Sequence, residues 1–128
     1  WVGSQRHAAH EIDPLPVALG RPTCDWRRAA LDGLEAAGRR HRVLYVSWNS
    51  TAVGAAVLAG LAVSVLPESA LRPGMRVLGE REGLPRLPMV EIGLLRGREE
   101  PSVVVEALTG HILSSLDNLS SAPWSTME

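Results

Sequence analysis

The clearest pattern of hydrophobic and polar positions lies in residues 43–67, VLYVSWNSTAVGAAVLAGLAVSVLP. An apolar run of strand type, residues 43–46, leads into the polar turn SWNST at residues 47–51. A small-residue helix pattern follows, Gly60 ends it, and a second strand stops at Pro67. This order predicts a strand–helix–strand crossover, the unit of a parallel sheet. Because α/β folds bind ligands beyond the carboxyl ends of their strands, the polar turn is a candidate binding position.

Two more strands and a helix are predicted before this unit. The strands are expected at residues 1–4 and 15–19, with a polar connection between them. Apolar residues then recur at helical spacing over residues 24–37, which predicts a helix that Gly38 ends. This helix follows a strand directly, so its first turn is expected at the same sheet edge as residues 47–51.

After Pro67 the pattern is weaker. Strands are expected at residues 75–78 and 90–96, and a helix is expected from Pro101. Its apolar stripe consists of Val104, Val105, Leu108, Ile112 and Leu116. The last strand and this helix have no second strand–helix pair to pack on. Either they join the first sheet as an outlier, or their partner elements lie outside the chain.

Composition narrows the class of protein. The chain has 128 residues, 45% of them hydrophobic, which is enough for one compact domain with a core. The net charge is −1 with both signs interspersed, so the sequence has no basic surface for nucleic acid or an anionic membrane. A single cysteine excludes an internal disulfide and fits a reducing compartment.

The longest apolar stretch, residues 52–66, is interrupted by Ser64 and is shorter than the roughly 20 residues that a spanning helix needs. No export signal is recognisable at the N-terminus, so a cytoplasmic protein is expected. The chain begins on Trp1 without a methionine and closes on a polar stretch, and we therefore expect a piece of a longer protein.

The first helix start carries the strongest candidate chemistry. Residues 21–28, RPTCDWRR, place free backbone N–H groups and fixed guanidinium donors where carboxylate or phosphate binds. The alternative is that Thr23 or Asp25 caps the helix, Trp26 packs, and the arginines are solvated. Two helix starts at one edge of a parallel sheet converge on one crevice, which favours ligand binding.

Other reactive residues give weaker indications. Cys24 at a helix start could be a nucleophile, but no base can be assigned beside it. His7, His10 and Glu11 have a loose metal-like spacing, and solvated histidines are the simpler interpretation. The sequence has no Gly-rich phosphate loop, no G-x-S-x-G and no paired CxxC. We therefore expect no enzyme activity, no cofactor and no metal.

With these residues placed, the order of elements resembles the effector-binding region of LysR-type transcriptional regulators. The similar segments are WVGS, PLPV, PTCDWRRAAL, LYVS, VLAGLAVSVLP and VEIGL, followed by the helix from Pro101. The phrase A-G-L-x-V-x-V-L-P is the most specific of them, and the match covers most of residues 1–117.

The resemblance implies an α/β, periplasmic-binding-protein-like (type II) fold, in which a small effector binds between two subdomains joined by crossing strands. Residues 1–78 would form the complete second (distal) β-α-β-α-β subdomain. Residues 79–117 would be the return crossing with the closing strand and helix of the first subdomain, and residues 118–128 a flexible tail.

By position, the resemblance implies effector contacts in two groups. The first is Cys24, Asp25, Trp26 and Arg27, and the second is Ser47, Trp48 and Asn49. Arg27 or Arg28 suggests an organic anion, and Trp48 suggests an apolar or aromatic portion of the effector.

The resemblance also implies partners. A homo-oligomer is expected through the helix of residues 27–38. The unpaired segment from Val90 is expected to pair with a second chain or to dock irregularly. DNA would be bound only through a winged helix-turn-helix absent from this chain, and no membrane is involved. The alternatives are a solute-binding receptor of a transport system with the same fold, and a small α/β enzyme using Cys24.

Overall fold

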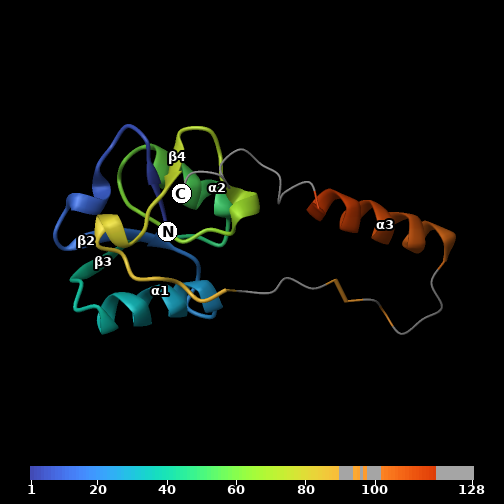
Figure 1. Ribbon diagram of the computed structural model, residues 1–128, viewed down its shortest axis with the longest axis horizontal. Helices are drawn as coiled ribbons and strands as arrows, with labels where there is room; N and C mark the ends of the chain where they lie inside the picture. The colour runs from blue at the N-terminus through green and yellow to red at the C-terminus, as the bar shows by residue number, and fades with distance from the viewer. Residues whose placement is uncertain (90–93, 96, 98–101, 118–128) are drawn as a thin grey trace. The chain divides into compact units, whose positions relative to one another are not determined.

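The computed structural model describes residues 1–89, 94–95, 97 and 102–117. The chain divides into two compact units, residues 1–89 and 90–128 (Figure 1). Most of the strand expected at residues 90–96, the expected helix start at Pro101 and the tail 118–128 lie outside the described residues.

The first unit is built on short strands. They are β1 (Val2–Ser4), β2 (Leu15–Leu19), β3 (His41–Val46) and β4 (Met75–Val77). β2 and β3 pair in parallel, with Leu15 opposite His41 and Leu19 opposite Val46. β1 and β4 pair antiparallel, so the beginning of this unit lies beside a segment near its end. These strands agree with the apolar runs in the sequence.

The strand predicted at residues 61–66 is present only as two isolated bridges. Ser64 pairs antiparallel with Val2 of β1, and Val63 pairs parallel with Val17 of β2. The N–H of Ala18 donates to the Val63 carbonyl at 2.8 Å, so this segment lies between the two small sheets. Each of these pairings is limited to a single bridge. The prediction of a full strand was therefore wrong, although the extended backbone is there.

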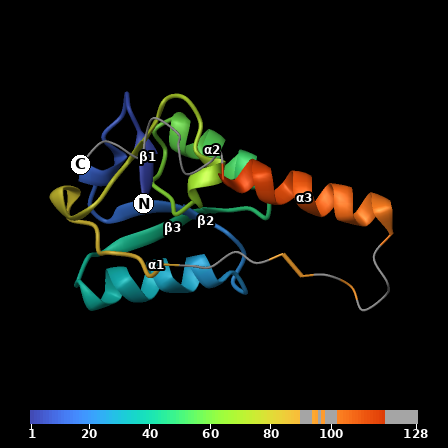
Figure 2. The same ribbon diagram turned by 45° about the vertical axis from the view of Figure 1, so that its right-hand side comes forward.

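Two helices cover the parallel pair. α1 (Asp25–Ala36) and α2 (Ser50–Leu58) lie on opposite faces of β2 and β3 (Figures 1 and 2). Gly38 and Gly60 follow them with φ of 62° and 72°, a left-handed conformation that glycine adopts without strain. Short 3₁₀ turns η1 (Ala9–Glu11), η2 (Glu68–Ala70) and η3 (Glu80–Glu82) complete the unit.

The core follows from the alternation of side chains along β2, whose five residues are all buried. Leu15, Val17 and Leu19 pack with Ala30 and Leu34 of α1. Ala18, which points to the other face, packs with Val53 of α2 and with Ala62. β2 is thus buried by a helix on each side. β3 lies at the edge of this pair, and its carboxyl end, residues 44–46, is exposed.

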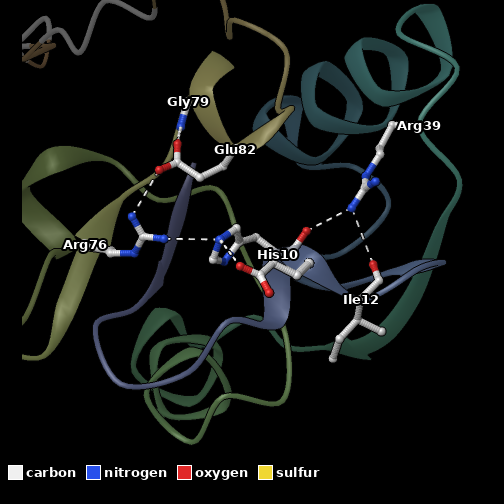
Figure 3. Close-up of polar contacts among 7 residues, drawn as sticks. His10, Ile12, Arg39, Arg76, Gly79 and Glu82 are labelled. Atoms are coloured by element: carbon white, nitrogen blue, oxygen red, sulfur yellow. Dashed lines mark hydrogen bonds and ion pairs between the residues drawn. The ribbon is translucent and has the colours of Figure 1, made fainter.

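A polar network joins η1 to β4 and η3 (Figure 3). His10 is buried, and its Nε2 lies 3.2 Å from a guanidinium nitrogen of Arg76. Arg76 donates to Glu82 at 3.0 Å, and Arg39 donates to the His10 carbonyl at 2.8 Å. Solvation of His10 was therefore a wrong prediction, because two arginines from distant segments enclose its ring and backbone.

In the second unit the structure has α3 (Val103–Asp117), two residues later than the predicted start. Val104, Val105 and Leu108 of its expected apolar stripe are exposed. No helix in the described part of the chain is long and apolar enough to cross a membrane.

Candidate functional site

The two predicted helix starts lie side by side at the carboxyl edge of β2 and β3. Both strands run in the same direction and end opposite each other, at Leu19 and Val46. The N–H of Ser47 donates to the Leu19 carbonyl at 3.1 Å, which ties the second loop to the first strand. The guanidinium carbon of Arg21 lies 5.1 Å from the centre of the Trp48 ring, so the loops also touch through side chains.

The first loop leads into α1 through Cys24, whose half-buried side chain makes no capping hydrogen bond. Thr23 and Asp25, the expected caps, do not take this role. Asp25 instead forms an exposed ion pair with Arg28 at 2.5 Å. The side chain of Trp26 is partly buried against the main core. The first turn of α1 therefore presents backbone N–H groups without a side-chain acceptor.

The second loop is stabilised by its own polar groups. The Oδ1 of Asn49 accepts from the N–H of Thr51 at 2.8 Å and caps α2. The Oγ of Ser47 accepts from the N–H of Asn49 at 3.1 Å. Between them, Trp48 is 83% exposed. The loop thus holds a large indole ring in solvent on a hydrogen-bonded base.

The arginines of the first loop have different surroundings. Arg28 is paired with Asp25, and Arg27 donates to the Gly20 carbonyl at 3.0 Å. Arg21 stacks on Trp48, and no carboxylate in the described ranges pairs with it. Arg21 lies in the segment 21–28 that the sequence analysis selected, but it was not among the individual effector contacts expected there. Two features of the sequence together could have identified Arg21. It is a cationic residue two positions after β2, and Trp48 is an aromatic residue two positions after the neighbouring β3.

Of the hollows in the described surface, one flanks the second loop, since Tyr45 and Ala52 line it, and another lies at the opposite end of β3. The first, of about 360 Å³, is apolar and lies between β3 and α2. Its lining is Leu44, Tyr45, Ala52, Ala55, Ala56, Leu61 and Ala62. The other, of about 490 Å³, is wide open and lies at the opposite end of β3, beside Arg39 and Arg40. Neither hollow is lined by a residue of the candidate site itself.

Within the described residues, no three or more histidine, cysteine, aspartate or glutamate side chains are grouped as a metal site would need. His10 and Glu11, two of the metal candidates in the sequence, are 3.8 Å apart between Nε2 and Oε1.

Comparison with known proteins gives a family match over most of the chain. The family described as "LysR substrate binding domain" matches residues 1–117. That family has the periplasmic-binding-protein-like, type II fold, so the expected fold class is confirmed.

Two curated relatives are similar over a large part of the chain. The HTH-type transcriptional regulator DgdR of Burkholderia cepacia is 34% identical over 119 residues, which are 93% of this chain and 40% of the relative. The HTH-type transcriptional regulator PecT of Dickeya dadantii (strain 3937) is 40% identical over 98 residues, 77% of this chain and 31% of the relative. The chain therefore spans less than half the length of either protein.

Proposed function

Because this chain belongs to the LysR substrate binding domain family, the effector-binding part of LysR-type transcriptional regulators, we propose that its two loops form one wall of an effector site. The contacts would come from Cys24, Asp25, Trp26 and Arg27 in the first loop. Ser47, Trp48 and Asn49 would contribute from the second.

The observation that carries this proposal is the adjacency of the two loops. A ligand that spans both can contact the free N–H groups of α1, the Arg21 guanidinium and the exposed Trp48 ring together. The carboxyl edge of parallel strands is where open α/β sheets bind ligands. The opposite wall of the site would come from another subdomain.

We assign residues 1–78 to the second subdomain, residues 79–117 to the return crossing and the C-terminal part of the first, and residues 118–128 to a tail. Leu84 and Pro85, near the start of the return crossing, pack against residues of the second subdomain. Leu84 is 1% exposed in the main core, and the Trp1 indole N–H donates to the Pro85 carbonyl at 2.8 Å. These contacts support a crossing segment that is fixed to the distal subdomain.

Regulation would then proceed by a shift between open and closed arrangements of two subdomains. An effector that binds the closed arrangement more tightly can raise the closed-to-open ratio by at most the ratio of its affinities for the two arrangements. This shift would change how a homo-oligomer in the cytoplasm binds DNA. The DNA would be bound through a winged helix-turn-helix outside this chain. Neither catalysis nor a membrane is part of this role.

The two alternatives receive less support. A transport receptor of the same fold is not favoured, because the relatives are named as transcriptional regulators. The same names give no support to an enzyme that uses Cys24.

The test uses the full-length protein that contains this chain and its operator DNA. A small-molecule library is screened for compounds that change the DNase footprint, and the active compound is then applied to variants. We expect Trp48→Ala to need a higher concentration of the active compound for the same change in footprint, while retaining DNA binding. Arg42→Ala, an exposed change near the other end of β3, should respond like the wild type.

Two results would contradict the proposal. If no small molecule changes the footprint, the chain does not sense an effector in this way. If an active compound acts equally on the wild type and on Trp48→Ala, the sensing site is not at these loops.

A further inference from the structure

We propose that Arg21 and Trp48 select an effector with a carboxylate joined to a flat apolar group. This inference rests on the proposed function, since it concerns the chemistry of the same site. It assigns the anion-binding role to an arginine that precedes α1, whereas the sequence pointed to Arg27 or Arg28.

The contacts of the three arginines separate their roles. Arg28 already has an anionic partner, Asp25, at 2.5 Å. Arg27 is half-buried and donates to the Gly20 carbonyl, which fixes the loop before α1. The exposed Arg21 has no carboxylate partner in the part of the chain that the structure describes. Its hydrogen-bond donors are therefore the ones left for a ligand.

The stacking of Arg21 on Trp48 suits this role. A guanidinium within about 6 Å of an aromatic centre is attracted to the ring face, and the pair here is at 5.1 Å. No hydrogen bond or ion pair in the described residues occupies the Arg21 guanidinium, so its N–H donors are available to a ligand. Those donors match the two oxygens of a carboxylate, which can accept two parallel hydrogen bonds.

The exposed indole ring determines the remainder of the ligand. Trp48 is 83% exposed, which is unusual for so large an apolar side chain. A flat group attached to the carboxylate would cover part of this ring and remove apolar surface from water. A compact anion such as phosphate would satisfy Arg21 alone and gain nothing from Trp48.

The experiment is a calorimetric titration of the full-length protein with four probes: benzoate, its uncharged counterpart benzamide, acetate and inorganic phosphate. Benzoate is expected to bind at millimolar concentration and more tightly than the other three. Arg21→Ala should weaken benzoate binding by about tenfold to a hundredfold, the effect of losing charge-assisted hydrogen bonds. Arg21→Lys should recover only part of that loss, because lysine lacks the planar fork.

The remaining variants separate the two interactions. Trp48→Ala should weaken benzoate by about threefold to tenfold and leave acetate unchanged. Arg42→Ala should match the wild type for every probe. The proposal is overturned if benzoate does not bind, if benzamide or phosphate binds as tightly, or if Arg21→Ala retains benzoate affinity. In each of these cases the proposed function stands as long as some small molecule changes the footprint on DNA.

Discussion

Asn49 connects the stability of α2 to the position of Trp48, so its substitution tests how the second loop is held. The Oδ1 of Asn49 accepts from the N–H of Thr51 at 2.8 Å, at the start of a nine-residue helix. Asn49→Ala removes this acceptor. Asn49→Asp keeps it and adds a negative charge at the positive end of the helix dipole.

The expected size of the effect follows from what the rest of α2 contributes. Val53 and Val57 are buried, so tertiary packing holds the middle of the helix whether or not it is capped. Loss of an N-cap costs about 1 kcal/mol, within a range of about 0.5–2 kcal/mol. About 1 kcal/mol corresponds to roughly a fivefold change in the equilibrium for opening the first turn. The second and third turns should be unaffected.

Amide hydrogen exchange, measured by NMR on residues 1–128, resolves this local change. The Thr51 amide should exchange about fivefold faster in Asn49→Ala and no faster in Asn49→Asp. The Val57 amide serves as the internal control and should be unchanged. Equal rates in the wild type and Asn49→Ala would refute the reasoning, as would an Asn49→Asp variant that frays as much as the alanine variant.

Three further changes test the first unit by urea denaturation of the same chain. Ser64→Ala removes the buried hydroxyl that donates to the Ala18 carbonyl at 2.6 Å. The free energy of unfolding should fall by about 1–2 kcal/mol. An unchanged midpoint of the urea transition would contradict this. Gly60→Ala should cost at least about 1–2 kcal/mol, because φ is 72° and the new methyl group would collide with a neighbouring imidazole; a stabilised variant would be inconsistent with that backbone. The hydrogen bond from the N–H of Gly79 lowers the pKa of Glu82 below its ordinary 4.5. The Glu82 carboxylate therefore stabilises the fold fully above pH 4.5. This stabilisation is lost as the pH falls through the lowered pKa. Glu82→Gln should therefore show a flatter loss of stability in acid, and an identical acid limb would show that the carboxylate does not contribute.

Much of the first unit could be predicted from local sequence. Apolar runs predicted β2 and β3, and helical spacing predicted α1. Gly38 and Gly60 indicated where the two helices end. These features depend on residues within a few positions of one another. The adjacency of the two loops could also be predicted, because parallel strands bring their carboxyl ends to one edge.

What could not be predicted depends on contacts between distant segments. The extended segment around Ser64 forms one bridge with β1 and one with β2 instead of a full strand. How these two strands lie beside it depends on the whole fold. His10 is buried by Arg76, which is 66 positions away. The contact between Arg21 and Trp48 depends on how two loop side chains meet, which no periodicity encodes.

The pairing of β1 with β4 has a consequence for synthesis of the protein. A ribosome produces Val2 long before Val77, its partner in the ladder. Until then the first strand has only the bridge around Ser64 to pair with, and that segment too is made late. Pairing between distant positions is slow because the intervening chain must first lose conformational freedom. The nascent polypeptide therefore exposes the segment around Val2 until its partners have been made, and chaperones that recognise apolar segments are expected to bind it.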